Sequence, residues 1–230
     1  MDLIFEYRAQ LLDGTIMTVQ LALASLAISL ICGLLGAWAK LSSSRVAQRL
    51  AGAYTTVVRG VPDLVLIMLV FYGGQVTLNN IGAATGLWGY IEISQFIAGA
   101  GTIGVIFGAY FTETFRGAIM AIPRGQIEAG ISCGMSKSLI FRHIIWPQMV
   151  RYALPGFTNN WLVELKATAL VSIIGLQDLV YNAFTAGRST GQLFTFMAAA
   201  FVIYLALTAV SDVLLRLLDR HYSRGVVRAR

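Results

Sequence analysis

Four long runs of apolar residues constrain this chain more than any other feature. A helix needs about 20 apolar residues to cross the roughly 30 Å hydrocarbon core of a bilayer, where unpaired backbone polar groups are not tolerated. Residues 15–39, 54–77, 96–119 and 193–215 meet this requirement. The sequence therefore predicts an all-α membrane protein.

Composition excludes a soluble or disordered chain. Only 12% of the 230 residues are charged and 57% are hydrophobic, whereas soluble domains carry about 25% charged residues. The two cysteines, Cys32 and Cys133, lie far apart in the sequence, so neither a disulfide scaffold nor a Cys-rich metal site is expected. A lipid bilayer is the solvent that this composition fits.

A fifth span is predicted over residues 161–180. It carries Glu164 and Lys166 near its start, so we expect it to pack inside a bundle rather than face lipid. The third span contains Gly99, Gly101, Gly104 and Gly108, small residues that allow close helix contact. No basic stretch precedes the first apolar run, so we expect that run to remain in the mature protein.

The distribution of basic residues predicts the orientation. Twelve of the 17 Lys and Arg residues fall on one side of the five spans, and only Arg8 and Arg188 fall on the other. Cytoplasmic segments of membrane proteins are enriched in Lys and Arg. We therefore expect the N-terminus outside and the C-terminus in the cytoplasm. The twelve residues are Lys40, Arg45, Arg49, Arg124, Lys137, Arg142, Arg151, Arg216, Arg220, Arg224, Arg228 and Arg230.

Residues 122–156 form the longest cytoplasmic segment of this topology. A segment of this length between spans is usually folded and functional. Pro123 opens it, and Pro147 and Pro155 are expected to break any continuous helix near its end. We predict two short helices joined by a turn at residues 133–135, as part of a single transmembrane domain over residues 1–230. Residues 79–91 are expected to form an external loop.

A spaced motif lies inside this cytoplasmic segment. Glu128, Ala129 and Gly130 are followed after three residues by Gly134, and Ile144-Ile145-Trp146-Pro147 comes nine residues later. A short helix that ends at a glycine suits a knob that docks into a groove of a partner, because glycine lets the chain reverse direction without a Cβ clash. An ordinary helix at the membrane surface is the alternative interpretation.

This motif resembles the cytoplasmic loop signature of the membrane subunits of ATP-driven, binding-protein-dependent importers. Gly130 stands where that family usually has alanine, and Trp146 stands where it usually has leucine. Further landmarks resemble the polar amino acid branch of the family, and residues 59–66 and 108–118 are similar to the first permease subunit of histidine and arginine/ornithine transporters. These landmarks are Arg59-Gly60-Val61-Pro62, Tyr110, Glu113, Arg116-Gly117, Gly125-Gln126 and Lys166-Ala167-Thr168-Ala169-Leu170.

The resemblance implies a type I ABC importer permease fold in the bacterial inner membrane. In that family the loop forms a coupling helix that sits in a cleft of a cytoplasmic ATPase. The implied partners are two copies of the ATPase, a related second permease in a heterodimer, and a periplasmic amino-acid-binding protein. The residues carried over to ATPase coupling are Glu128, Ala129, Gly130, Gly134, Ile144 and Pro147.

No catalytic residue, metal or nucleic acid is expected. The sequence lacks the P-loop pattern G-x-x-x-x-G-K-[ST], so ATP and Mg²⁺ are expected on the partner ATPase and no cofactor on this chain. An intramembrane enzyme is disfavoured because the only histidines, His143 and His221, are both expected on the cytoplasmic side without a Cys or acidic cluster.

Charged side chains at bilayer depth cost at least about 2.5–3.5 kcal/mol, so each one needs a physical reason. Glu113 and Arg116 are three residues apart on one helix and can pair. We expect Arg59, Arg116 and Lys166 to form an intramembrane charge cluster, and a purely structural role for this cluster is the alternative to a functional one.

Asp63 is the candidate substrate-binding acid because it follows Pro62, which frees backbone carbonyls in the second span. A carboxylate with nearby hydroxyls suits a guanidinium or ammonium group. The expected substrate path therefore comprises Asp63, Thr112, Glu113 and Thr114. No role is assigned to Glu164.

The function expected from these observations is that of a permease subunit that imports basic amino acids such as histidine, arginine, lysine and ornithine. Opines or other polar amino acids are alternative substrates. A proton-coupled secondary transporter is the alternative from another class, although five spans without an internal repeat fit it poorly.

Overall fold

The computed structural model describes residues 2–222, which form helices and turns and no β-strand. The predicted all-α class is confirmed. In chain order the helices are α1 (Asp2–Glu6), α2 (Arg8–Leu41), α3 (Arg45–Gly60), α4 (Asp63–Met68), the π-helical turn η1 (Leu69–Gly73), α5 (Gly74–Thr85), α6 (Gln95–Met120), α7 (Arg124–Ser132), α8 (Lys137–Ile140), the π-helical turn η2 (Phe141–Ile145), α9 (Trp146–Ala167), the 3₁₀ segment η3 (Thr168–Ile174), α10 (Leu179–Thr190) and α11 (Leu193–Tyr222).

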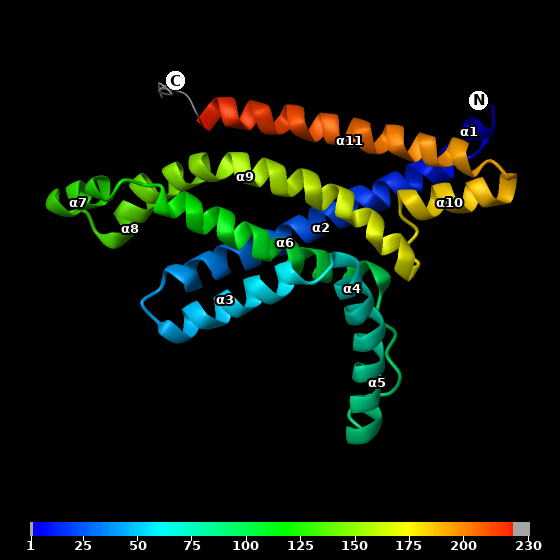
Figure 1. The fold of residues 1–230 in the computed structure, drawn as a ribbon, viewed down its shortest axis with the longest axis horizontal. Helices are drawn as coiled ribbons and strands as arrows, with labels where there is room; N and C mark the ends of the chain where they lie inside the picture. Colours follow the sequence, from blue (N-terminus) through cyan, green and yellow to red (C-terminus); the bar gives the residue numbers. More distant parts are fainter. Residues whose placement is uncertain (1, 223–230) are drawn as a thin grey trace.

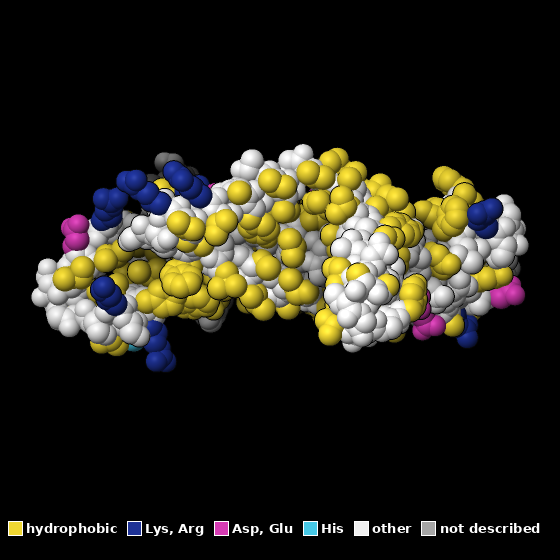
Figure 2. Space-filling view, turned by 90° about the horizontal axis from the view of Figure 1, so that it is seen from below, with side chains coloured by type: hydrophobic (Ala, Val, Ile, Leu, Met, Phe, Trp, Pro, Cys, Tyr) yellow, Lys and Arg dark blue, Asp and Glu magenta, His cyan; other side chains and the backbone are white. Residues whose placement is uncertain are grey.

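Helices α2, α6, α9 and α11 run along the long axis of the molecule, and α3 packs beside α2 and α6 (Figure 1). The start of α2 and the α7–α8 loop lie at opposite ends of this axis, and α11 ends on the side of the loop. Hydrophobic side chains cover the middle of the face shown in Figure 2, and Lys and Arg side chains gather toward the end that carries the loop. This distribution is that of a bundle that crosses a bilayer along its long axis.

Four helices are long and apolar enough to cross a membrane: Arg8–Leu41, Asp63–Thr85, Gln95–Met120 and Leu193–Arg220. Three of them coincide with the first, third and last predicted spans. The second lies several residues later than predicted. The expected fifth span, residues 161–180, does not form one apolar helix, because α9 ends at Ala167 and gives way to η3.

A break at Val61 and Pro62 explains the shift of the second span. Val61 is extended, with φ −109° and ψ 139°, because a proline disfavours helical geometry in the residue before it and cannot donate a backbone hydrogen bond itself. The chain therefore turns sharply. Ile67 of α4 is still buried in the core of the bundle, whereas α5 projects away from it (Figure 1). We refer to residues 63–94, which include the segment that returns along α5, as the arm.

Two further expectations about helix ends are wrong. Pro147 and Pro155 do not interrupt helix α9, since Pro147 lies in its first turn and Pro155 lies inside it. A first-turn proline loses no helical hydrogen bond, and α9 continues through the exposed Pro155. The segment between the helices α6 and α9 therefore ends at Ile145. Residues 79–85 also belong to α5, which stops at Gly86 in a left-handed conformation with φ +67°.

Glycines bring α2 and α6 into close contact. A Cβ atom at Gly36 would lie 2.2 Å from Oγ1 of Thr112, and one at Gly104 would lie 2.6 Å from Cβ of Ile28. The expected packing role is met at Gly99, Gly104 and Gly108, each of which would place a Cβ within 2.7 Å of a neighbouring atom. At Gly101 a Cβ would meet nothing within 4 Å, so this glycine makes no close contact within the chain.

Candidate functional site

The α7–α8 loop contains the predicted pair of short helices and the turn between them. Gly134 has φ +76°, a conformation that L-residues with a side chain rarely adopt. The amide of Cys133 donates to the carbonyl of Ala129 at 3.0 Å, and the amide of Met135 donates to that of Gly130 at 3.0 Å. These bonds satisfy the last carbonyls of α7, so the glycine fixes where the helix ends.

Gly130 holds α7 against the segment that leads into α9. It is buried, and a Cβ there would lie 2.9 Å from Cδ1 of Ile144. At the far end of the loop, Gln148 donates to Oε1 of Gln126 at 2.5 Å. The spacing between Gly130 and Ile144 in the motif thus corresponds to a packing contact across the loop.

The other motif residues face outward. Glu128, Ala129 and Pro147 are exposed, and the side chain of Ile131 is 62% exposed although it is apolar. A rigid helical knob with an exposed apolar residue and an exposed carboxylate can insert into a complementary groove.

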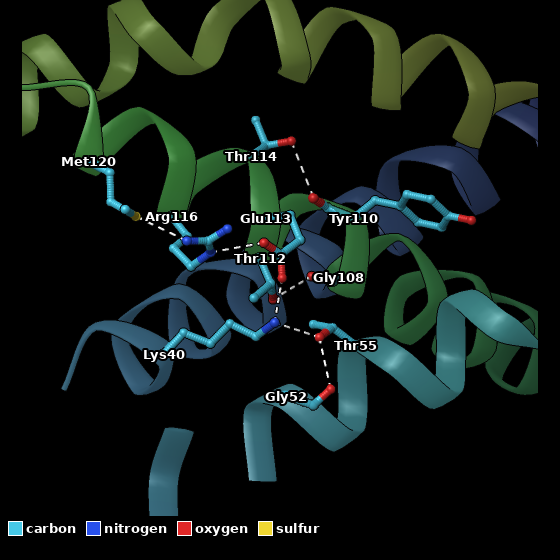
Figure 3. Close-up of polar contacts among 10 residues, drawn as sticks. All are labelled: Lys40, Gly52, Thr55, Gly108, Tyr110, Thr112, Glu113, Thr114, Arg116 and Met120. Atoms are coloured by element: carbon cyan, nitrogen blue, oxygen red, sulfur yellow. Dashed lines mark hydrogen bonds and ion pairs between the residues drawn. The ribbon is translucent and has the colours of Figure 1, made fainter. Parts of the chain in front are cut away.

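A second polar site joins three helices near the loop end of the bundle. Lys40 from α2 contacts Oε1 of Glu113 on α6 and also donates to Oγ1 of Thr55 on α3 at 2.6 Å (Figure 3). Arg116 donates through Nε to Oε2 of Glu113 at 2.9 Å. The predicted pairing of Glu113 with Arg116 is therefore present. We call Lys40, Thr55, Glu113 and Arg116 the polar seam.

Arg59 lies beside the polar seam and Lys166 does not join it. The Arg59 guanidinium lies 5.0 Å from the centre of the Tyr110 ring, and Arg59 lines the same pocket as Lys40 and Glu113. Lys166 is exposed on α9. It lies six residues after Asn160, the α9 residue that contacts Thr114 on α6, and therefore about 9 Å further along the helix. Among the described residues Lys166 forms no ion pair.

The candidate substrate-path residues have different surroundings. Asp63 is half-buried at the first turn of α4, and its carboxylate makes no hydrogen bond or ion pair with any described residue. Thr112 is fully buried against α2. Thr114 faces α9, where it accepts a hydrogen bond from Nδ2 of Asn160 at 3.0 Å. Only Asp63 therefore presents an unpaired acidic group.

Glu164 lies inside the bundle with none of its surface exposed. The hydroxyl of Ser29 on α2 lies 3.3 Å from its Oε2, and its Oε1 has no hydrogen-bond partner among the described residues. Glu164 thus faces α2.

Five residues of these polar contacts were not singled out as site residues by the sequence: Ser29, Lys40, Thr55, Gln148 and Asn160. Lys40 is 73 residues from Glu113, and its place at the end of an apolar run suggested only a topology signal. No local pattern connects positions that far apart, so only the packing of α2 and α3 on α6 reveals the contact.

Comparison with protein families matches residues 13–224 to the family described as binding-protein-dependent transport system inner membrane component. The match covers the bundle, the arm and the α7–α8 loop. The match therefore includes the polar seam as well as the loop.

Three curated relatives are similar along nearly their whole length. The histidine/lysine/arginine/ornithine transport system permease protein HisQ of Escherichia coli (strain K12) is 48% identical over 99% of both chains. The octopine transport system permease protein OccQ of Rhizobium radiobacter is 43% identical and covers 95% of this chain and 92% of its own. The arginine ABC transporter permease protein ArtQ of Haemophilus influenzae is 38% identical over 95% of this chain and 96% of its own.

Two solved structures share the fold. A crystal structure of an amino acid ABC transporter with histidines aligns with a TM-score of 0.79 and 31% identity over 95% of this chain and 96% of that chain. An inward-facing form of the MetNI methionine ABC transporter aligns with a TM-score of 0.74 and 17% identity over 94% of this chain and 98% of that chain.

Proposed function

Because this chain belongs to the family of inner membrane components of binding-protein-dependent transport systems, we propose that it is the permease subunit of an ATP-driven importer of basic amino acids. The observation that carries this proposal is the 48% identity over 99% of the chain to a permease for histidine, lysine, arginine and ornithine. The chain is a non-catalytic transport subunit, and ATP and Mg²⁺ are bound by a separate ATPase.

The transport cycle that fits this assignment is alternating access between two membrane-embedded permeases. A binding protein delivers the amino acid from outside, and two ATPase subunits hold the α7–α8 loops. Closure of the ATPases on ATP moves the loops together and opens the path outward, and hydrolysis resets it. Glu128, Ala129 and Pro147 face the ATPase in this scheme, while Gly130, Gly134 and Ile144 give the loop its shape.

Gly134→Trp tests the coupling role. The left-handed backbone at Gly134 disfavours any side chain by about 1–2 kcal/mol, and the indole would also obstruct docking. We expect ATP-driven uptake by reconstituted complexes to fall at least about tenfold while ATP hydrolysis continues. Gly125→Ala is the control, since it lies on α7 where a Cβ meets nothing within 4 Å. Undiminished coupled uptake in Gly134→Trp would refute the role.

Orientation and docking are tested together through Cys133, which is exposed in the loop. A membrane-impermeant thiol reagent is expected to label it in inverted inner-membrane vesicles and not in intact spheroplasts. Added ATPase is expected to protect it. Labelling from the outer side would reverse the proposed topology, with the N-terminus outside and the loop in the cytoplasm.

Asp63 is the residue proposed to attract the cationic substrate, and Thr114 on α6 is kept in the proposed path. We leave Thr112 and Glu113 out of this set because Thr112 is buried against α2 and both carboxylate oxygens of Glu113 are already paired. Loss of a charge-assisted hydrogen bond in Asp63→Asn is expected to raise the KM for arginine about tenfold. Asp212→Asn on α11, whose side chain is 31% exposed and pairs with Arg216, is the control. Unchanged uptake of arginine, lysine and histidine by an assembled Asp63→Asn complex would remove Asp63 from the site.

An opine is the second candidate substrate, and the 43% identity to an octopine permease favours it. Purification of the complex from detergent-solubilised membranes, with identification of its subunits by mass, comes first. A related second permease, an ATPase and a binding protein are expected. Stimulation of ATP hydrolysis by arginine, histidine, lysine, ornithine or octopine with the binding protein then assigns the substrate. ATP-independent uptake driven by a proton gradient would instead indicate a secondary transporter.

A further inference from the structure

A pocket at the loop end of the bundle carries more positive than negative charge. It has a volume of about 340 Å³ and lies between the end of α2, the second half of α3 and α6. Lys40, Arg59, Thr56, Tyr110 and Glu113 line it. Its single carboxylate, Glu113, is already bound by Lys40 on one oxygen and by Arg116 on the other.

The charges around the pocket do not balance within the described residues. Among the residues that line the pocket, Lys40 and Arg59 supply two positive charges and Glu113 supplies one negative charge. Arg116, which does not line the pocket, also pairs with Glu113. Arg59 is exposed and makes no ion pair with a described residue. Its guanidinium lies over the Tyr110 ring, an arrangement that fixes the direction of its free donors.

The pocket lies near the loop end of α6. Glu113 is seven residues before the end of this helix, about 10 Å along it. An anionic group from outside the chain would pair with the exposed guanidinium of Arg59.

An apolar groove begins next to the pocket. It has a volume of about 410 Å³ and lies between α6 and the bend that joins α3 to α4. Val58, which precedes Arg59, and Ile106, one helical turn from Tyr110, form its near end, and Ile97 forms its far end. Ile97 and Tyr110 are 13 residues apart on α6, so pocket and groove together extend about 20 Å. One leaflet of hydrocarbon is about 15 Å thick.

We propose that the pocket and the groove together bind an anionic phospholipid of the leaflet that faces the α7–α8 loop. The phosphate occupies the pocket beside Arg59 and Lys40, and an acyl chain lies along the groove between α6 and the α3–α4 bend. Basic pockets between helices on the cytoplasmic side of membrane proteins take such headgroups. Inorganic phosphate or the carboxylate of an amino acid would match the pocket but leave the groove empty.

One substitution is expected to fill the groove without a steric clash. Gly101 lines the groove, and a Cβ there would meet nothing within 4 Å. Gly101→Leu therefore fills the space of an acyl chain, whereas Gly101→Ala leaves most of it open. For the headgroup, Arg59→Gln removes the free guanidinium, and Arg49→Gln removes an exposed cation from the same helix outside the pocket.

The experiment measures lipid binding to the purified complex of permeases and ATPase by native mass spectrometry. The delipidated complex is titrated with dioleoylphosphatidylglycerol or with dioleoylphosphatidylcholine. We expect the wild-type complex to bind phosphatidylglycerol in preference to phosphatidylcholine. Arg59→Gln is expected to weaken phosphatidylglycerol binding about fivefold, and Gly101→Leu is expected to weaken binding of the same lipid. Arg49→Gln and Gly101→Ala are expected to bind as the wild type does.

Competition separates the possible sources of the anion. If inorganic phosphate or arginine at millimolar concentration displaces phosphatidylglycerol from the wild-type complex, the pocket is a site for a small anion and the proposal is wrong. Equal binding of the two lipids, or binding that neither Arg59→Gln nor Gly101→Leu alters, would also overturn it. Thermal melting of each variant complex confirms that the binding data refer to folded protein.

Discussion

The α2–α6 pair and the arm are both strongly apolar, yet they are used in opposite ways. In the most apolar part of α6, 67% of the residues are buried inside the chain, compared with 6% in the arm helix Asp63–Thr85. The high buried fraction of α6 accompanies close helix packing, because Gly36 and Gly104 let the backbones of α2 and α6 approach closely. Apolar character alone therefore does not decide how far a segment is buried within its own chain, and close contacts at glycines accompany the burial of α6.

The largest effect is expected from Gly36→Leu. Its Cβ alone would lie 2.2 Å from Oγ1 of Thr112, so the helices must separate, at a cost of about 1–3 kcal/mol or more. We expect a much lower yield of monodisperse complex and a lower melting temperature. Gly101→Leu places the same side chain on α6 in open space and is expected to assemble normally. Equal losses in both variants would mean that close packing does not distinguish the bundle from the arm.

A smaller effect is expected at the polar seam, where an ion pair joins α2 to α6. Glu113→Gln leaves Lys40 and Arg116 without their carboxylate, and the side chains of Lys40 and Glu113 are only 16% and 25% exposed. We expect a loss of about 1–3 kcal/mol in the free energy of unfolding, measured as a shift in thermal melting.

Asp212→Asn provides the matched exposed ion pair, because its partner Arg216 is 72% exposed. A loss of at most about 0.5 kcal/mol is expected there. Adding Lys40→Met to Glu113→Gln is expected to restore part of the stability, since one unpaired cation is removed. If Glu113→Gln and Asp212→Asn shift melting equally, the polar seam is no more important than a surface pair.

The smallest effect is expected in the arm. Gln75 donates to the carbonyl of Ile91 at 2.5 Å and accepts from the amide of Ile93 at 2.7 Å, which holds the returning segment against α5. Gln75→Leu is expected to loosen this segment by about 1 kcal/mol and leave the bundle unchanged. Hydrogen exchange should rise in residues 86–94 alone. The exposed neighbour Val76→Ala is the control, and faster exchange in α6 would show that arm and bundle are coupled.

The α7–α8 loop is the region where sequence reasoning succeeded most fully. The prolines of the segment and the turn at residues 133–135 indicated two short helices, and Gly134 has the left-handed backbone that such a turn requires. The signal was local, since a helix, its end and its partner segment lie within 20 residues. The expectation was wrong at Pro155, which lies inside α9 without ending it.

The sequence by itself determined the membrane environment, the all-α class, three of the spans and the loop motif, because hydropathy, charge asymmetry and glycine spacing are properties of neighbouring residues. Only the tertiary structure decided that Lys40 meets Glu113, that Lys166 stands apart, that Asp63 is left unpaired and that α5 leaves the bundle. These outcomes depend on how helices far apart in the chain are rotated and spaced. Such geometry is set by side-chain packing over the whole bundle, which a one-dimensional pattern does not contain.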